Sequence, residues 1–107
     1  MPASTVSIVL TTLGADADAA AIARTLIDER LAACVNILPA MTSIYRWQGR
    51  VEREREQQMV IKTASSRIPD LQARLRQLHP YELPEFLVVD AAGSDAYLAW
   101  VVGESAR

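Results

Sequence analysis

The stretch from Val51 to Thr63 constrains the fold most, because its charged side chains alternate in sign with a period of two. Glutamates take one set of alternate positions and arginines the other (Glu52, Glu54 and Glu56 against Arg53 and Arg55). Successive side chains of an extended strand point to opposite faces, so this order gives one acidic and one basic face. The stretch ends in Met59-Val60-Ile61, an apolar run that suits a sheet. We therefore predict a strand.

The residues before this stretch predict its partner strand. Gln48-Gly49 is a turn signal, and Ser43, Tyr45 and Trp47 alternate ahead of it, so that they would share one face. The prediction is a long hairpin. The alternative is a charged surface helix, because the glutamate, arginine and glutamine content of the second arm also has good helix propensity.

The rest of the chain predicts further strands and amphipathic helices. We expect strands at 6–12, 33–38 and 85–90, and helices at 16–31, 68–78 and 95–103. Asp16 is the expected N-cap of the first helix, and Ser65 or Ser66 offers a cap to the second, because short polar side chains accept bonds from the free amides of a helix start. Pro39 interrupts the second strand, which resumes toward Ser43.

The order of these elements is β-α-β-β-α-β followed by a C-terminal helix. This is the ferredoxin-like topology of the α+β class, and we predict it for a single domain covering residues 1–107. Two helices would cover one face of a four-stranded antiparallel sheet. The other face would keep apolar groups, from Val9 or Ile8 and from Leu87 or Val88, and we expect another subunit to cover it.

Composition and charge narrow the function. The net charge is −2, and Lys62 is the only lysine beside ten arginines, nearly all with an acid close by in sequence. A mixed-charge surface of this kind does not predict nucleic-acid binding, and no apolar run is long enough to cross a membrane. Cys34 is the only cysteine, which fits a reducing compartment, and Met1 to Val6 has no signal-peptide pattern. We expect a cytoplasmic protein.

Three residues are candidate metal ligands. His79 is the only histidine, and imidazole binds copper or zinc well. The thiolate of Cys34 suits copper(I), and Glu82 could add an oxygen ligand or act as an acid–base group. Each also has a structural interpretation: His79 as the end of a helix, Cys34 as a small hydrophobe within a strand, and Glu82 as an ion-pair partner of Lys62 or an arginine.

Other residues are candidates for lining a ligand cleft. Lys62 could hold an anion at the end of a strand. Tyr81 lies in a loop that Pro80 and Pro84 restrict to few conformations, which would preorganise a site. Aromatic side chains could line the cleft or pack between subunits (Tyr45, Trp47, Tyr97 and Trp100).

Five stretches, in order and at similar spacings, resemble the CutA family. They are Arg30-Leu31-Ala32-Ala33-Cys34-Val35-Asn36-Ile37, Ser43-x-Tyr45-x-Trp47-x-Gly49, Ile61-Lys62-Thr63, His79-Pro80-Tyr81-Glu82-x-Pro84-Glu85 and Tyr97-Leu98-x-Trp100. The resemblance implies a homotrimer of ferredoxin-like subunits, similar in architecture to nitrogen-regulatory signalling trimers. It also implies a link to tolerance of divalent metals, with copper binding in some members.

The sequence departs from some metal-binding relatives at two positions. Thr11 stands where they have a cysteine, and Leu78 where they have a second histidine. Neither residue supplies a soft or imidazole ligand, so copper is the expected metal only if other donors complete the site.

The leading hypothesis is a trimeric protein that binds copper or another divalent ion. The alternative is a small-molecule or anion-binding signalling trimer with sites in clefts between subunits. Without a readable nucleophile–base pair or phosphate loop, an enzyme is the weaker class.

Overall fold

The computed structural model describes residues 5–106. Its elements, in chain order, are β1 (Val6–Gly14), α1 (Ala19–Asp28), β2 (Cys34–Ile37), β3 (Met41–Trp47), β4 (Arg50–Ala64), the 3-10 turn η1 (Ser65–Arg67), α2 (Ile68–Leu78), β5 (Leu87–Ala91) and α3 (Asp95–Ser105). None of these helices is long and apolar enough to cross a membrane.

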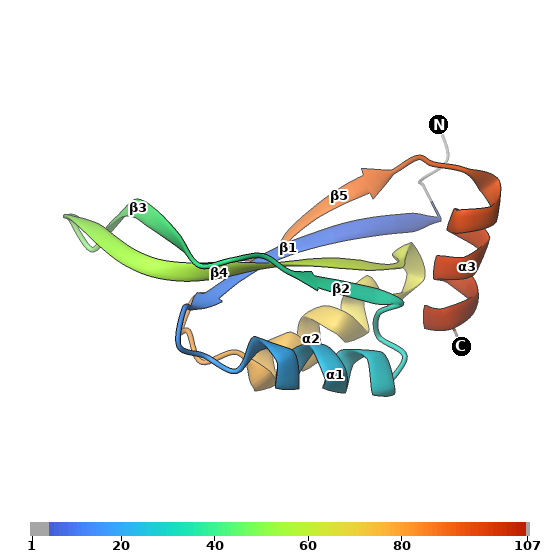
Figure 1. The fold of residues 1–107 in the computed structure, drawn as a ribbon, viewed down its shortest axis with the longest axis horizontal. Helices are drawn as coiled ribbons and strands as arrows, with labels where there is room; N and C mark the ends of the chain where they lie inside the picture. The colour runs from blue at the N-terminus through green and yellow to red at the C-terminus, as the bar shows by residue number, and fades with distance from the viewer. Residues whose placement is uncertain (1–4, 107) are drawn as a thin grey trace.

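The strands form one antiparallel sheet in the order β2-β4-β1-β5, and β3 also pairs with β4 (Figure 1). Apart from β3, this is the predicted four-stranded ferredoxin-like sheet with a C-terminal helix, so the fold class is confirmed. The strand predicted to resume after Pro39 is a separate element, because β2 pairs near the C-terminal end of β4 and β3 pairs near its start.

The hairpin prediction is confirmed, and the alternative of a charged helix is wrong. β3 and β4 are joined by Gln48 and Gly49, both with positive φ (50° and 79°), the backbone of a tight two-residue hairpin turn. The hairpin extends beyond the rest of the sheet, which gives the molecule its long axis of 43 Å (Figure 1). Its register sets Glu52, Glu54 and Glu56 on one face and the two arginines between them on the other.

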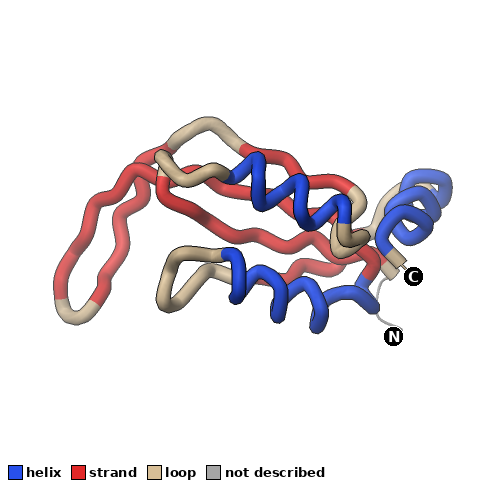
Figure 2. The backbone as a smooth tube through the Cα atoms, turned by 90° about the horizontal axis from the view of Figure 1, so that it is seen from below, coloured by secondary structure: helices blue, strands red, loops and turns tan. Residues whose placement is uncertain are grey.

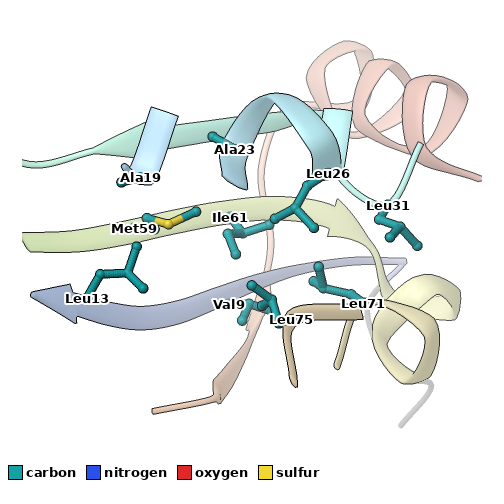
Figure 3. Close-up of a cluster of buried hydrophobic side chains, with 11 residues drawn as sticks. Val9, Leu13, Ala19, Ala23, Leu26, Leu31, Met59, Ile61, Leu71 and Leu75 are labelled. Atoms are coloured by element: carbon teal, nitrogen blue, oxygen red, sulfur yellow. The ribbon is translucent and has the colours of Figure 1, made fainter. Parts of the chain in front are cut away.

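Helices α1 and α2 lie side by side across one face of the sheet (Figure 2). Alternate residues of β1 and β4 point into the layer between sheet and helices and meet leucines of both helices (Figure 3). The buried cluster is Val9, Leu13, Ala19, Ala23, Leu26, Leu31, Ala32, Met59, Ile61, Leu71 and Leu75. Its apolar burial supplies the main favourable term in folding.

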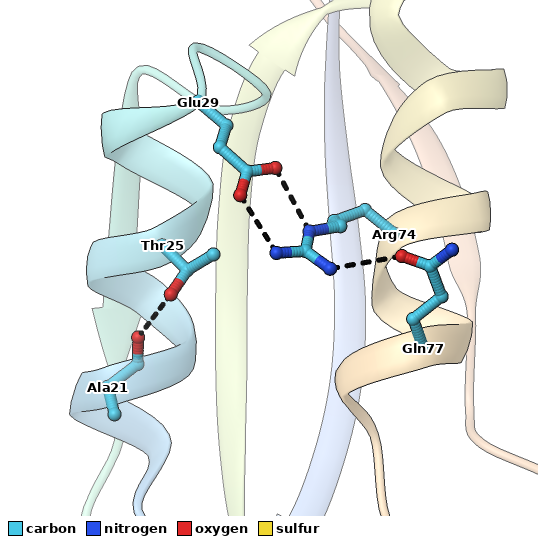
Figure 4. A network of polar contacts seen from close by, with 5 residues as sticks. All are labelled: Ala21, Thr25, Glu29, Arg74 and Gln77. Atoms are coloured by element: carbon cyan, nitrogen blue, oxygen red, sulfur yellow. Dashed lines mark hydrogen bonds and ion pairs between the residues drawn. The ribbon is translucent and has the colours of Figure 1, made fainter.

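A bidentate ion pair joins the two helices at the surface. The guanidinium of Arg74 on α2 donates to both carboxylate oxygens of Glu29, just after α1, at 3.0 and 2.9 Å, and also to Gln77 at 3.0 Å (Figure 4). Because this pair is partly exposed, it contributes less than the buried leucines beneath it.

Both predicted helix caps are wrong. Asp18, not Asp16, caps α1, with its carboxylate accepting a bond from the amide of Ala21. The start of α2 has no side-chain cap, because Ser65 and Ser66 fall in η1 and the Ser65 hydroxyl bonds to that of Ser7 at 2.7 Å. The Ser65 hydroxyl, which the local sequence predicted to cap α2, therefore makes a tertiary hydrogen bond instead.

The second face of the sheet carries apolar side chains without a helix over its middle (Figure 1). The register sets Leu87 beside Leu10 and Val89 beside Ile8 on this face, and Val9 and Val88 on the helix side. The register therefore decides between the alternatives that the sequence left open: Ile8 and Leu87, not Val9 and Val88, lie on the second face. Leu87 and Val89 are 55% and 49% exposed. We call this surface the bare face; α3 covers only its end, where Ser105 donates to Val101 and accepts from the amide of Ala64.

Two buried threonines give a matched test of the core. The Thr11 hydroxyl has no hydrogen-bond partner among residues 5–106, whereas that of Thr63 donates to the Leu31 carbonyl at 2.8 Å. Thr11→Val should raise the free energy of unfolding by about 1 kcal/mol, and Thr63→Val should lower it by about 1–2 kcal/mol. Urea unfolding at equal protomer concentration measures both. A loss of stability in Thr11→Val equal to that in Thr63→Val would contradict this account.

Candidate functional site

A groove of about 690 Å³ opens where the hairpin leaves the sheet. The pairing of β1 with β4 ends at Gly14 and Glu56, so the first residues of β4 pair with β3 alone. The loop between α2 and β5 forms the other wall. The groove is lined by Thr12, Met41, Ser43, Tyr45, Trp47, Glu56, Gln58, Pro80, Tyr81, Glu82, Leu83 and Glu85.

One wall of the groove is a face of β3. Alternate residues from Met41 to Trp47 line it, which confirms the shared face predicted for Ser43, Tyr45 and Trp47. Tyr45 and Trp47 are 40% and 39% exposed, so part of each residue is accessible to a ligand. Burial against its surroundings raises the pKa of the Tyr45 phenol, and the charges of Glu54, Glu56 and Glu52 raise it further.

His79 holds the loop wall onto the sheet. It follows the last residue of α2 and is buried, and its Nε2 lies 2.6 Å from the Thr12 carbonyl oxygen. Its Nδ1 accepts a bond from the Tyr81 amide at 3.1 Å, so the ring is the tautomer that donates from Nε2. β5 pairs with β1 only as far as Leu10, and His79 supplies a donor to the edge beyond it. Both ring nitrogens are therefore occupied within the chain.

Tyr81 makes a second tie between loop and hairpin. Its hydroxyl donates to the Glu56 carboxylate at 2.7 Å, and its ring packs 4.8 Å from that of His79. Burial raises the pKa of the Tyr81 phenol, and the hydrogen bond to Glu56 and the charge of Glu56 raise it further. Below, "the clasp" means these bonds of His79 and Tyr81.

Among the described residues, the charged side chains that line the groove are all acidic. Glu56, Glu82 and Glu85 line it, and no lysine, arginine or histidine of residues 5–106 does. The amide of Gln58 donates weakly to Glu85 at 3.5 Å. The exposed Glu82 has no hydrogen bond or ion pair with other described residues. A surface with this charge favours cationic ligands over anions.

The three predicted metal ligands do not meet within one chain. Cys34 pairs with Lys62 of β4, whereas Thr12, which His79 contacts, pairs with Gln58 of the same strand. Lys62 and Gln58 are four residues apart along β4. At 3.3 Å per residue this is about 13 Å, too far for shared coordination. Over residues 5–106, no three His, Cys, Asp or Glu side chains lie close enough to hold a metal ion. The set of His79, Cys34 and Glu82 stays a prediction that needs donors from elsewhere.

The predicted cleft residues divide between two places. Tyr45, Trp47 and Tyr81 line the groove, whereas Lys62 and Trp100 lie toward the other end of the sheet. The Lys62 ammonium is 5.9 Å from the centre of the Tyr97 ring, which in turn lies 5.6 Å from that of Trp100. Trp100 borders a smaller hollow of about 440 Å³ with Arg30 and Glu104, an ion pair at 3.8 Å.

Sequence reasoning did not assign Glu56, Glu85 and Thr12 to the site. Glu56 was visible as the last glutamate of the alternating row, and Glu85 as the end of the His79-Pro80 motif. No sequence signal pointed to Thr12, because it takes part through its backbone carbonyl.

Comparison with known proteins gives consistent matches along the chain. The model of the family described as CutA1 divalent ion tolerance protein matches residues 7–104. The chain is 45% identical over 95 residues to the divalent-cation tolerance protein CutA of Thermus thermophilus, covering 88% of this chain and 92% of that one. It is 47% identical over 81 residues to mouse protein CutA, covering 75% of this chain but 46% of the longer mouse protein.

A solved structure also matches the fold over most of the chain. The structure titled "PII-like protein CutA from Nostoc sp. PCC 7120 in apo form" superposes with a TM-score of 0.86 at 39% identity. The match covers 92% of this chain and 96% of that one. Fold and sequence therefore agree over nearly the whole chain.

The Tyr81–Glu56 bond predicts a late-titrating phenol. The pKa of Tyr81 is raised above its ordinary value of about 10, so the folded state favours the protonated phenol. Stability from this bond should be complete below about pH 10 and lost as pH rises through the folded pKa. The difference in ultraviolet titration between the native protein and Tyr81→Phe isolates this phenol.

Glu56→Gln should move that titration to lower pH, because it removes the carboxylate that accepts the bond. Tyr97→Phe removes a tyrosine outside the groove and should leave the late component in place. Loss of the late component in Tyr97→Phe, and not in Tyr81→Phe, would contradict the assignment.

Proposed function

The chain belongs to the CutA family of divalent-cation tolerance proteins, and from this premise we propose that it works as a homotrimer that binds divalent cations at the groove. One observation carries the proposal: three glutamates line the groove, and no basic side chain of residues 5–106 does. Carboxylate oxygens are the ligands that hard divalent cations prefer.

The chain's residues do not fit a copper site built from His79, Cys34 and Glu82 alone. Both nitrogens of His79 are engaged, and Cys34 lies on another part of the sheet. The proposal therefore rests on Glu82 and Glu85, with further donors from a neighbouring copy. His79 would act by holding the loop that carries these carboxylates.

The bare face supports assembly. Its apolar side chains, Leu87 and Val89 among them, are a large exposed surface for a chain of this size. Thr12 and Gln58, which line the groove, lie on the same face of the sheet as Leu10 and Val60 by strand alternation. A copy covering the bare face would thus border the groove and could supply the missing donors.

A second function remains supported by the size of the groove. A space of about 690 Å³ is in the range of small-molecule pockets and far exceeds one ion. A structural neighbour is titled PII-like, which fits the small-molecule signalling alternative. The anion form of that alternative has less support, because Lys62 lies outside the groove. The Thermus thermophilus relative is named as a tolerance protein and not as an enzyme, and we propose no reaction.

Assembly through the bare face can be tested on β5. Leu87→Asp sets a charge among apolar side chains that a second copy would cover, so the trimer should dissociate. Val88→Asp is the matched control, since Val88 is similarly exposed (46%) on the opposite face of the same strand. Native mass spectrometry reads the result. A trimer that survives Leu87→Asp as well as it survives Val88→Asp would contradict assembly through this face.

Cation binding can be tested on the groove carboxylates. In titrations with magnesium, zinc and copper, Glu82→Gln with Glu85→Gln should weaken uptake at least about tenfold, because each removes a charged ligand. Glu104→Gln, an acid of the other hollow, should leave uptake unchanged. His79→Gln should have a smaller effect than the double variant. Uptake lost in His79→Gln and retained in the double variant would move the metal to His79.

A further inference from the structure

The groove is shaped for an extended ligand. Cations such as Mg²⁺ and Ca²⁺ need oxygen ligands converging within about 2.0–2.6 Å of one point. In the part of the chain that the structure describes, the groove carboxylates do not converge in this way. The β3 wall runs from Met41 to Trp47, about 20 Å at 3.3 Å per residue. A long groove with separated charges matches a ligand whose own charges are separated.

The walls of the groove add apolar and aromatic surface. Met41, Tyr45 and Trp47 lie along one wall, and Leu83, 70% exposed, lies on the other. Ring faces attract ammonium groups within about 6 Å of their centres, and they also pack against methylene chains. Apolar and aromatic walls offer a hydrated metal ion few favourable contacts. An alkyl chain with ammonium groups can make both kinds of contact, ammonium to ring face and methylene to ring.

One carboxylate is already committed to the protein. Glu56 is 6% exposed and accepts the Tyr81 hydroxyl, so it anchors the loop and adds negative charge at the base of the groove. Glu82, which has no partner in the described part of the chain, and Glu85, whose Gln58 bond is long at 3.5 Å, are the carboxylates free to meet a ligand. Both follow the clasp in the same loop.

We propose that this groove binds a linear alkyl polyammonium ion, with ammonium groups at Glu82 and Glu85 and its methylene chain along Met41, Tyr45 and Trp47. The inference rests on the proposed function in that it uses the same groove, but it names a different ligand class. The metal ion and the organic cation would compete for the same carboxylates.

Spermidine is the probe that tests it. Calorimetric titration of the full-length protein in EDTA should show saturable binding that weakens as salt rises, because the contacts are charged. The neutral chain 1,8-octanediol should show none. Glu82→Gln and Glu85→Gln should each weaken spermidine binding about tenfold. Trp47→Leu should weaken it about three- to tenfold through loss of the ring face.

Trp100→Leu and Glu104→Gln are the matched controls, an exposed tryptophan and an acid outside the groove, and should leave spermidine binding unchanged. Circular dichroism and native mass establish that each variant is folded and assembled as the parent is. Spermidine binding that does not saturate, or that Trp47→Leu and Trp100→Leu change equally, would overturn the inference.

The same variants separate this inference from the proposed function. Metal uptake that depends on Glu82 and Glu85, without spermidine binding, would overturn the inference and leave the proposed function standing. Spermidine binding that depends on Trp47, without metal uptake at the groove, would support the inference and remove the metal proposal.

Discussion

Strand β4 is the constraint on which the rest of the structure depends, because β1, β2 and β3 all pair with it. Its period of two assigns every side chain to a face. Met59 and Ile61 thereby enter the core beneath the helices, while Glu56 and Gln58 face the groove. A shift of one residue in its register would exchange these sets and expose the core, so the hydrophobic pattern fixes the register and the register builds the groove.

The groove exists because β4 is longer than its neighbours β1 and β2. Beyond the end of β1, the β3–β4 hairpin continues without a further strand beside it. The clasp joins the loop after α2 to the sheet at this point. Two ties make this connection, from His79 to the Thr12 carbonyl and from Tyr81 to Glu56. The loop that continues from these ties carries Glu82 and Glu85, so the position of these carboxylates depends on a histidine that need not touch any ligand. On this account, the histidine is a structural residue of the site.

The elements that could be predicted from the sequence are those whose signal is local and periodic. The alternating charges of β4, the Gln48-Gly49 turn and the leucine spacing of α2 each reflect their own backbone geometry, and all appear as expected. The errors come from long-range contacts. Ser65 bonds to Ser7 instead of capping a helix, and His79 bonds to a carbonyl 67 positions away, which no local pattern contains. Whether Ile8 or Val9 faced the helices likewise required the sheet register.

The central claim is that His79 serves the groove as a clasp, with both ring nitrogens engaged inside the chain. Because His79 is the only histidine, a two-bond proton–nitrogen correlation spectrum of uniformly labelled protein at neutral pH reports on it alone. The account predicts a ring protonated at Nε2 and unprotonated at Nδ1, with nitrogen shifts that do not change when zinc is added to saturation. A ring protonated at Nδ1, or an Nε2 resonance that moves to a metal-bound position with zinc, would contradict it.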